Sequence, residues 1–319
     1  PRTAPPPAPS SSSLSATLPR THDQAGASPF RSISPESADR SEPPLWTLGD
    51  TTVDALAGPK GLDPDGVHEI KPARLQPIET CDDEAISSAS ETYADWASAW
   101  GAARVFALAL IARRMRMLTA TGDTTRPALW CQIRASADDL GELYAPGLSA
   151  FGIAPERLLV VEVGTARDAL WVLEEALRSG SLTLVAGAFP DAVHNVGLTP
   201  ARRLALAAQA HATPCLVLTH PQTQSMAATA TRWRIEPLDS APHVFAGSTA
   251  LTAAADAIAD RLPGARHLRV GLERSRAQPL AGSVSQARVS WCDETFCFRM
   301  AAPVRNRTHG VCAPWRHTA

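Results

Sequence analysis

Residues 158–189 read LLVVEVGTARDALWVLEEALRSGSLTLVAGAF, and this stretch decides the fold. Its two ends, 158–163 and 182–189, are apolar runs with the length of buried strands. Between them, residues 167–178 repeat apolar side chains at helical spacing, with charged side chains on the opposite face. A strand, an amphipathic helix and a second strand predict a βαβ unit with parallel strands.

The same alternation extends to both sides of this unit. Further strands are expected at 66–70, 128–133, 214–218 and 232–238. Further helices are expected at 51–57, 104–118, 136–144 and 201–212. Ser136 and Asp139 would cap the third of these, which Pro146-Gly147 interrupts, and Thr199-Pro200 would cap the fourth. This rhythm predicts an α/β fold in which helices flank a mostly parallel sheet.

The pattern changes after residue 240. A helix is expected at 250–262, and apolar residues then alternate over 268–272. Residues 287–291 and 295–300 predict an antiparallel hairpin. We therefore expect a core at 45–240, which includes an acidic insertion at 72–100, and a C-terminal extension at 241–300.

Both ends of the chain differ from this core. Residues 1–44 are rich in Pro and Ser and hold too little apolar surface to offset chain entropy, so a disordered tail is expected. Residues 301–319 contain arginines and histidines and no acidic residue, which predicts a basic, flexible tail.

Composition limits the possible functions. The formal net charge of −2 gives no overall field that favours nucleic acid. The six cysteines form no C-x-x-C pair, so we expect reduced thiols in a cytoplasmic protein and no structural zinc. No run of 18 apolar residues is present, so no membrane span is expected.

The insertion has an unusual charge. From Leu75 to Trp100 the chain carries six acidic residues and no Lys or Arg, and Trp96 and Trp100 close the segment. One interpretation is a solvated insertion whose last part joins the next helix. The other is an acidic docking segment that presents its tryptophans to a partner.

Several nucleotide and catalytic motifs are missing from the whole chain. The phosphate-binding pattern G-x-x-x-x-G-K-[ST] does not occur, nor does G-x-G-x-x-G. The nucleophile elbow G-x-S-x-G is also missing.

Four segments, 139–148, 168–180, 198–208 and 230–235, together resemble one family in order and spacing. The chain resembles the ImuA-type inducible mutagenesis proteins, which are RecA-like accessory proteins of bacterial translesion synthesis. The resemblance covers residues 45–240 well and 265–300 more loosely. It implies a RecA-like core without ATPase activity and without a cofactor. It also implies three partners after DNA damage: a degenerate Y-family polymerase homologue, an error-prone C-family polymerase, and RecA itself.

The RecA pattern assigns roles to positions that lack the required chemistry here. Its phosphate loop would fall in the acidic insertion and at 100–104, where no lysine is present. The magnesium-supporting aspartate, the catalytic glutamate and the γ-phosphate-sensing glutamine would fall near Ala188, Arg134 and His220. We therefore expect no catalytic, cofactor-binding or metal-binding residue, and a protein that is not an enzyme.

Surface residues are then the functional candidates. The loops 190–198 and 219–231, which would touch DNA in a RecA-like fold, contain no Lys or Arg. Cations in the first turn of helix 201–212 oppose the helix dipole, which suggests a role beyond helix stability. The partner-binding candidates are Arg202, Arg203, Arg232, Trp233, Arg234, Trp96 and Trp100. Surface or core packing is the alternative, and DNA contact is a further alternative for the arginine cluster with Trp233. The weaker DNA-binding candidates are Arg113, Arg114 and Arg116, for which stabilisation of a helix C-terminus is the alternative.

The leading hypothesis is a non-catalytic RecA-like adaptor for SOS-induced, error-prone DNA synthesis. An ATPase with a non-standard phosphate loop and a single-strand DNA-binding module are the two alternatives.

Overall fold

The computed structural model describes residues 46–58, 61–73, 87–134, 140–192, 194, 196–239, 265–277 and 285–301, with backbone only at 87–95 and 285. The predicted tail at 1–44 lies outside these residues, as do the helix at 250–262 and the cap at Ser136 and Asp139. So does the acidic run at 79–84. Of the predicted tail at 301–319, only residue 301 is described.

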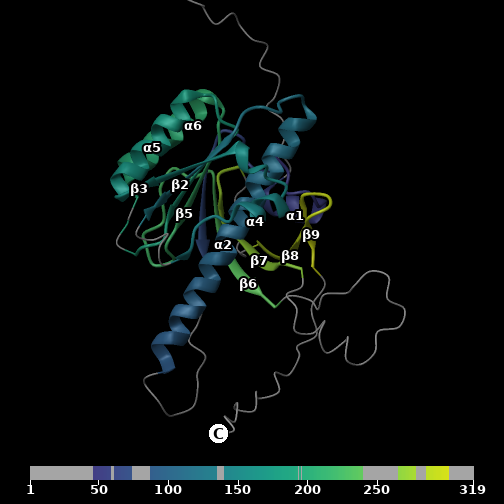
Figure 1. The fold of residues 1–319 in the computed structure, drawn as a ribbon, viewed down its shortest axis with the longest axis vertical. Helices are drawn as coiled ribbons and strands as arrows, with labels where there is room; N and C mark the ends of the chain where they lie inside the picture. The colour runs from purple at the N-terminus through teal and green to yellow at the C-terminus, as the bar shows by residue number, and fades with distance from the viewer. Residues whose placement is uncertain are drawn as a thin grey trace, which may run out of the picture. The chain divides into compact units, whose positions relative to one another are not determined.

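The strands of the described residues form one nine-stranded sheet in the order β3-β2-β4-β5-β1-β6-β7-β8-β9 (Figure 1). The strands are β1 Val67–Pro72, β2 Ala128–Ile133, β3 Leu158–Val163, β4 Leu184–Phe189, β5 Cys215–Thr219, β6 Thr231–Leu238, β7 His267–Ser275, β8 Ser285–Cys292 and β9 Cys297–Met300. The pairs among β1–β6 are parallel, and β7, β8 and β9 continue the sheet antiparallel.

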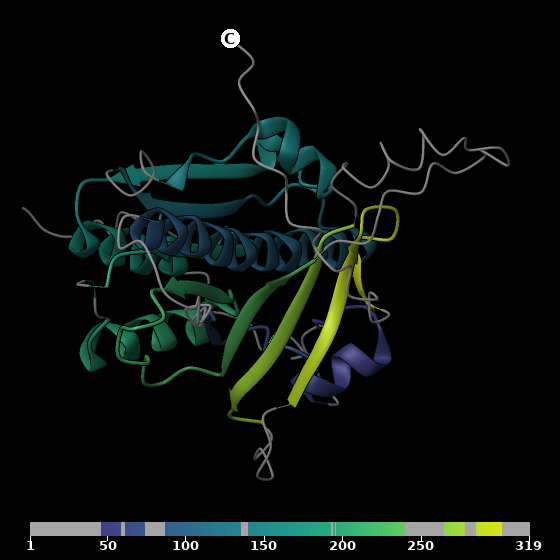
Figure 2. The same cartoon turned by 90° about the horizontal axis from the view of Figure 1, so that it is seen from below.

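Helices cover both faces of this sheet (Figures 1 and 2). They are α1 Thr51–Ala57, α2 Ser87–Ala120, α4 Ala145–Ala150, the 3-10 turn η1 Pro155–Arg157, α5 Ala166–Ser179 and α6 Leu198–His211. Side chains alternate along β2, so Trp130 joins the core under α2 while Leu129 and Cys131 join the core under α5 and α6. None of the described helices has the length and apolarity that a membrane span needs.

Helix α5 shows how the sequence sets these elements. The Thr165 hydroxyl caps its start by accepting the Asp168 N–H at 3.1 Å, and Gly180 ends it in the left-handed conformation at φ 63°. Leu173 and Leu177 are fully buried against the sheet. The expected fold class is confirmed: a mostly parallel sheet flanked by helices, with an antiparallel C-terminal hairpin.

Three helix boundaries differ from the expectation. α2 begins at Ser87 rather than 104, so residues 100–104 lie inside a helix and form no loop. α6 begins at Leu198, which moves Arg202 and Arg203 out of its first turn. Residues 141–144 are not helical, and α4 begins at Ala145 because Pro146 fits a first helical turn, where its missing N–H costs nothing.

A buried chain of hydrogen bonds fixes the start of β1. The Trp233 Nε1–H donates to the Thr231 hydroxyl at 2.8 Å, and that hydroxyl lies 2.7 Å from Nδ1 of His68. The other ring nitrogen of His68 lies 2.8 Å from the Asp63 carbonyl, which can only accept, so Nε2 carries the proton. Burial lowers the pKa of His68 to about 4, because the charged ring would lose its hydration.

Because the pKa of His68 is lowered in the folded protein, we expect the protein to lose stability in mild acid. Between pH 6.5 and about 4 the unfolded His68 binds a proton that the folded ring does not, so the free energy of unfolding should fall by about 3 kcal/mol. Urea unfolding of wild type and His68→Gln at several pH values measures this contribution. Asp65, whose pKa is raised to about 6 mainly by its hydrogen bond with Asp63, acts in the opposite sense in both proteins. Identical pH slopes for the two proteins would contradict the assignment.

Candidate functional site

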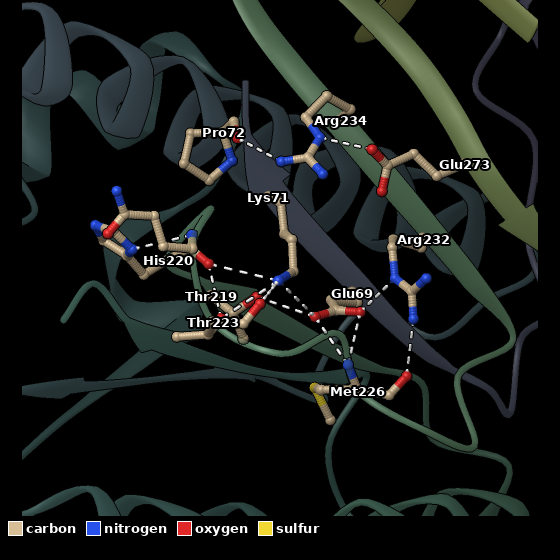
Figure 3. A network of polar contacts seen from close by, with 11 residues as sticks. Glu69, Lys71, Pro72, Thr219, His220, Thr223, Met226, Arg232, Arg234 and Glu273 are labelled. Atoms are coloured by element: carbon tan, nitrogen blue, oxygen red, sulfur yellow. Dashed lines mark hydrogen bonds and ion pairs between the residues drawn. The ribbon is translucent and has the colours of Figure 1, made fainter. Parts of the chain in front are cut away.

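The carboxyl ends of β1 and β5 meet beside β6, at the edge where open α/β sheets bind ligands. Figure 3 shows a network of polar side chains at this edge. Glu69 and Lys71 are two residues apart on β1 and therefore point to the same face of the sheet. Both are buried, with exposed fractions of 0% and 1%.

The Glu69 carboxylate is fully bonded within the protein. It accepts the Arg232 Nε–H at 2.7 Å, the Thr219 hydroxyl at 3.1 Å and the Met226 N–H at 3.1 Å. A buried charge is tolerated only with such compensation. The carboxylate thus ties β1 to β5, to β6 and to the loop between them.

The Lys71 ammonium is also occupied. Its Nζ donates to the Thr223 carbonyl at 2.6 Å and to the Thr223 hydroxyl at 3.3 Å. The His220 carbonyl accepts at 3.5 Å, and Glu69 lies 3.6 Å away. Burial lowers the pKa of Lys71, and the nearby Glu69 carboxylate opposes that shift. This lysine is therefore engaged with the chain itself and does not face a ligand.

Two arginines extend the network across β6. Arg232 also donates to the Met226 carbonyl at 2.9 Å. Arg234 donates to Glu273 of β7 at 2.7 Å and to the Pro72 carbonyl at 3.1 Å. These contacts fix the loop 220–230 onto β1.

Helix α2 covers the same edge. The Trp96 ring lies against the His220 ring, with centroids 4.6 Å apart, and Trp100 is 2% exposed. Arg104 donates from Nη1 to the carbonyls of Leu140 and Gly141 at 2.9 and 2.8 Å, and burial lowers its pKa.

A small cavity lies next to α2 at this edge of the sheet. A cavity of about 20 Å³ lies beneath Trp100 and Arg104, at the ends of β2 and β4. That volume holds about one water molecule, whereas small-molecule pockets measure roughly 300–1,000 Å³. Among the described residues no cluster of three or more His, Cys, Asp or Glu could hold a metal ion.

Three positions at this edge correspond to the aspartate, glutamate and glutamine of the RecA pattern, and none of them carries the corresponding side chain. Ala188 is a buried residue of β4. Arg134 follows β2 with an exposed side chain, 3.8 Å from Glu162. His220 packs on Trp96, and its Nδ1 accepts the Gln222 N–H at 3.2 Å.

The prediction that Trp233 and Trp100 bind a partner at the surface is wrong. Trp233 is fully buried in β6 against Phe106 of α2, and Trp100 is buried in the same core. Side chains without exposed surface cannot anchor a partner. Trp96 is only partly exposed, and Arg232 and Arg234 serve the internal network.

The pair on α6 lies at the surface. Arg202 is exposed, and Arg203 makes a bidentate contact with the buried Glu174 of α5 at 3.1 and 2.7 Å. Because α6 begins earlier than expected, the argument from the helix dipole does not apply to either arginine. Arg203 instead compensates the Glu174 carboxylate.

The DNA-binding candidates have structural partners. Arg113 donates to the carbonyl and hydroxyl of Thr47 at 3.0 and 2.8 Å. Arg114 is 5% exposed and lies over the Trp46 ring, and burial lowers its pKa to about 10. Arg116 is exposed and lies over Phe296.

The sequence analysis missed Glu69, Lys71 and their loop partners. A signal was present, because the expected strand at 66–70 lies in a parallel core and yet residues 67–72 read VHEIKP. Ionisable residues in a central strand require buried partners. Those partners, Thr223, Met226 and Arg232, lie more than 150 residues away in sequence.

Comparison with known proteins found similar solved structures. A crystal structure of the RadB recombinase is similar to this chain with a TM-score of 0.46 and 12% sequence identity, over 81% of this chain and 100% of that one. No protein-family model and no curated protein matches the chain.

Replacing Glu69 tests the network. Glu69→Gln leaves the buried Lys71 and the partly buried Arg232 without an anion, which should lower the free energy of unfolding by about 3–5 kcal/mol. Glu273→Gln is the matched control, because it removes a partly exposed partner of Arg234 and should cost less than about 1 kcal/mol. Urea unfolding measures both variants. Equal costs would show that the Glu69 site is not a buried charge network.

Proposed function

We propose that this chain is a non-catalytic, RecA-like adaptor that acts in the cytoplasm during SOS-induced, error-prone translesion DNA synthesis. It docks polymerase components of the mutagenesis cassette and takes no cofactor. The Y-family polymerase-like protein is the primary partner. The error-prone C-family polymerase and RecA are further partners.

One observation carries the non-catalytic part of the proposal. The described carboxyl edge is filled by the chain's own side chains, and its only buried lysine among the described residues, Lys71, is held by Thr223 and Glu69. A phosphate cradle needs a lysine and backbone N–H groups that face the ligand. Turning Lys71 toward a phosphate would break its contacts and remove a cation from beside the Glu69 carboxylate.

The resemblance to ImuA-type proteins supports the biological role. Its four segments lie in the RecA-like core at 139–148, 168–180, 198–208 and 230–235. Three of them contribute to α4, α5 and α6, and the fourth enters β6. The proposed partners follow from this resemblance.

The outer side of α5 and α6 supports a docking role. Trp171, Leu198 and Leu206 are 62%, 67% and 59% exposed on these two helices. Arg202 is exposed on α6. A hollow of about 450 Å³ is lined by residues of both helices, among them Glu174 of α5 and Leu206 of α6. Exposed Trp and Arg are frequent interface anchors. We call Trp171, Leu198, Arg202 and Leu206 the α5–α6 surface. Its exposed arginine and apolar residues fit an acidic, amphipathic segment of the polymerase-like partner.

The described structure favours neither alternative. An ATPase with an unusual loop would need Lys71 or another cation to reach a triphosphate. A single-strand DNA-binding module would need phosphate contacts, but Arg113 and Arg114 are committed to Thr47 and Trp46.

The purified protein should not hydrolyse ATP, and its melting temperature should not change with Mg²⁺-ATP, because none of the residues described at the carboxyl edge is arranged to bind it. Thermal unfolding with and without millimolar nucleotide measures this, with a phosphate-releasing assay alongside. A melting temperature that rises with nucleotide concentration would refute the non-catalytic proposal.

The double variant Trp171→Ala, Arg202→Ala should weaken binding of the purified polymerase-like protein at least about tenfold, because it removes two anchors of the α5–α6 surface. Tyr144→Ala is the matched control, since Tyr144 is 74% exposed but lies outside that surface. Titration calorimetry measures both, with RecA and the C-family polymerase as parallel arms. Unchanged affinity for every partner would remove this surface from the proposal.

A further inference from the structure

The β8–β9 hairpin places two cysteines opposite each other. Cys292 ends β8, Cys297 begins β9, and the two are register partners in the antiparallel ladder. The turn between them closes with the Phe296 N–H donating to the Cys292 carbonyl at 2.9 Å. Phe296 adopts a left-handed φ of 50° in this turn.

This pairing suits a disulfide bond. Residues directly opposite in antiparallel strands have Cα atoms roughly 4.5–5.5 Å apart, and disulfides span roughly 4.4–6.8 Å between Cα atoms. Both thiols are free and partly exposed, so an oxidant can reach them.

One hydroxyl lies beside both sulfurs. Oγ1 of Thr295 is 2.9 Å from Sγ of Cys297. Hydrogen bonds from Thr295 and Glu294, together with the charge of Arg299, lower the pKa of Cys292 and outweigh the opposing effect of burial. A lowered pKa raises the fraction of reactive thiolate at neutral pH.

Two other cysteines provide the contrast. Cys131 and Cys215 are buried in the core under α5 and α6, and burial raises the pKa of each thiol to about 12. Buried, protonated thiols are unreactive.

The hairpin also holds the first described residues. The Phe298 N–H donates to the Leu48 carbonyl at 2.9 Å, and Gly49 packs against Cys297 so closely that a Cβ there would clash. Gly49 also has a φ of 125°, which disfavours any other residue. A change at Cys297 therefore acts directly on the segment that leads into α1.

We propose that Cys292 and Cys297 form a reversible dithiol–disulfide site that peroxides oxidise and small thiols reduce. The Cys292 thiolate attacks a peroxide oxygen, giving a sulfenic acid and releasing hydroxide. The Cys297 sulfur then attacks the Cys292 sulfur, forming the S–S bond and releasing water. Overall, two thiols and one hydrogen peroxide give one disulfide and two waters. The two thiols lose two electrons and two protons.

Mass spectrometry of the full chain tests this site directly. Trypsin cuts after Arg288 and Arg299, so residues 289–299 carry both cysteines on one peptide. Cys81→Ser and Cys312→Ser in the test protein remove the two thiols not considered above. After hydrogen peroxide and alkylation, the peptide should be about 2 Da lighter than its reduced form and unalkylated. Dithiothreitol should then restore two alkylation sites.

Three variants separate this chemistry from general oxidation. Cys297→Ser should accumulate a Cys292 sulfenic acid that dimedone traps, and Cys292→Ser should trap little. Thr295→Val should slow alkylation of Cys292 at neutral pH, because loss of the hydroxyl raises its pKa. Overoxidation without a disulfide, or disulfides only between chains, would overturn the proposal. So would equal reactivity of Cys131 and Cys292 in the folded protein.

Discussion

The buried carboxylate of Glu69 holds the centre of this structure together. It joins β1 to β6 through Arg232, to β5 through Thr219, and to the following loop through the Met226 N–H. Lys71, two residues after Glu69 on β1, also binds this loop, because its Nζ donates to the Thr223 carbonyl. A buried charge that has lost its hydration is stabilised only by hydrogen bonds and ion pairs with other groups of the protein. The described residues at this carboxyl edge are therefore engaged in contacts within the chain.

The carboxyl edge of the sheet and the exposed side of α5 and α6 therefore differ in what their side chains do. The edge where α/β proteins usually place ligands is committed to stability and is covered by α2, through Trp96 and Trp100. The exposed side of α5 and α6 carries no such commitment and presents Trp171 and Arg202. This division supports the proposal that the chain binds other proteins and does not turn over nucleotide. The hairpin cysteines lie at the antiparallel end of the same sheet.

The sequence predicted the regular elements well, because their patterns are local. The strands at 128–133 and 158–163 and the helix at 167–178 were found at or within one residue of their observed bounds. Helix starts were less accurate: Ser87 lies in an acidic stretch without apolar periodicity, and Pro200 fits the third helical position as well as the first. The network at Glu69 was missed because its partners come from distant segments. Trp233 and Trp100 were misplaced at the surface because composition alone does not reveal which face of an element is buried.

A crystal structure determined in the presence of magnesium and a non-hydrolysable ATP analogue tests the central claim most directly. We expect that Lys71 Nζ still donates to the Thr223 carbonyl and that the Trp96 ring still packs against His220. We also expect no nucleotide density above the ends of β1 and β5. Ordered phosphates at that edge, with Lys71 turned toward them and a metal ion beside them, would contradict it.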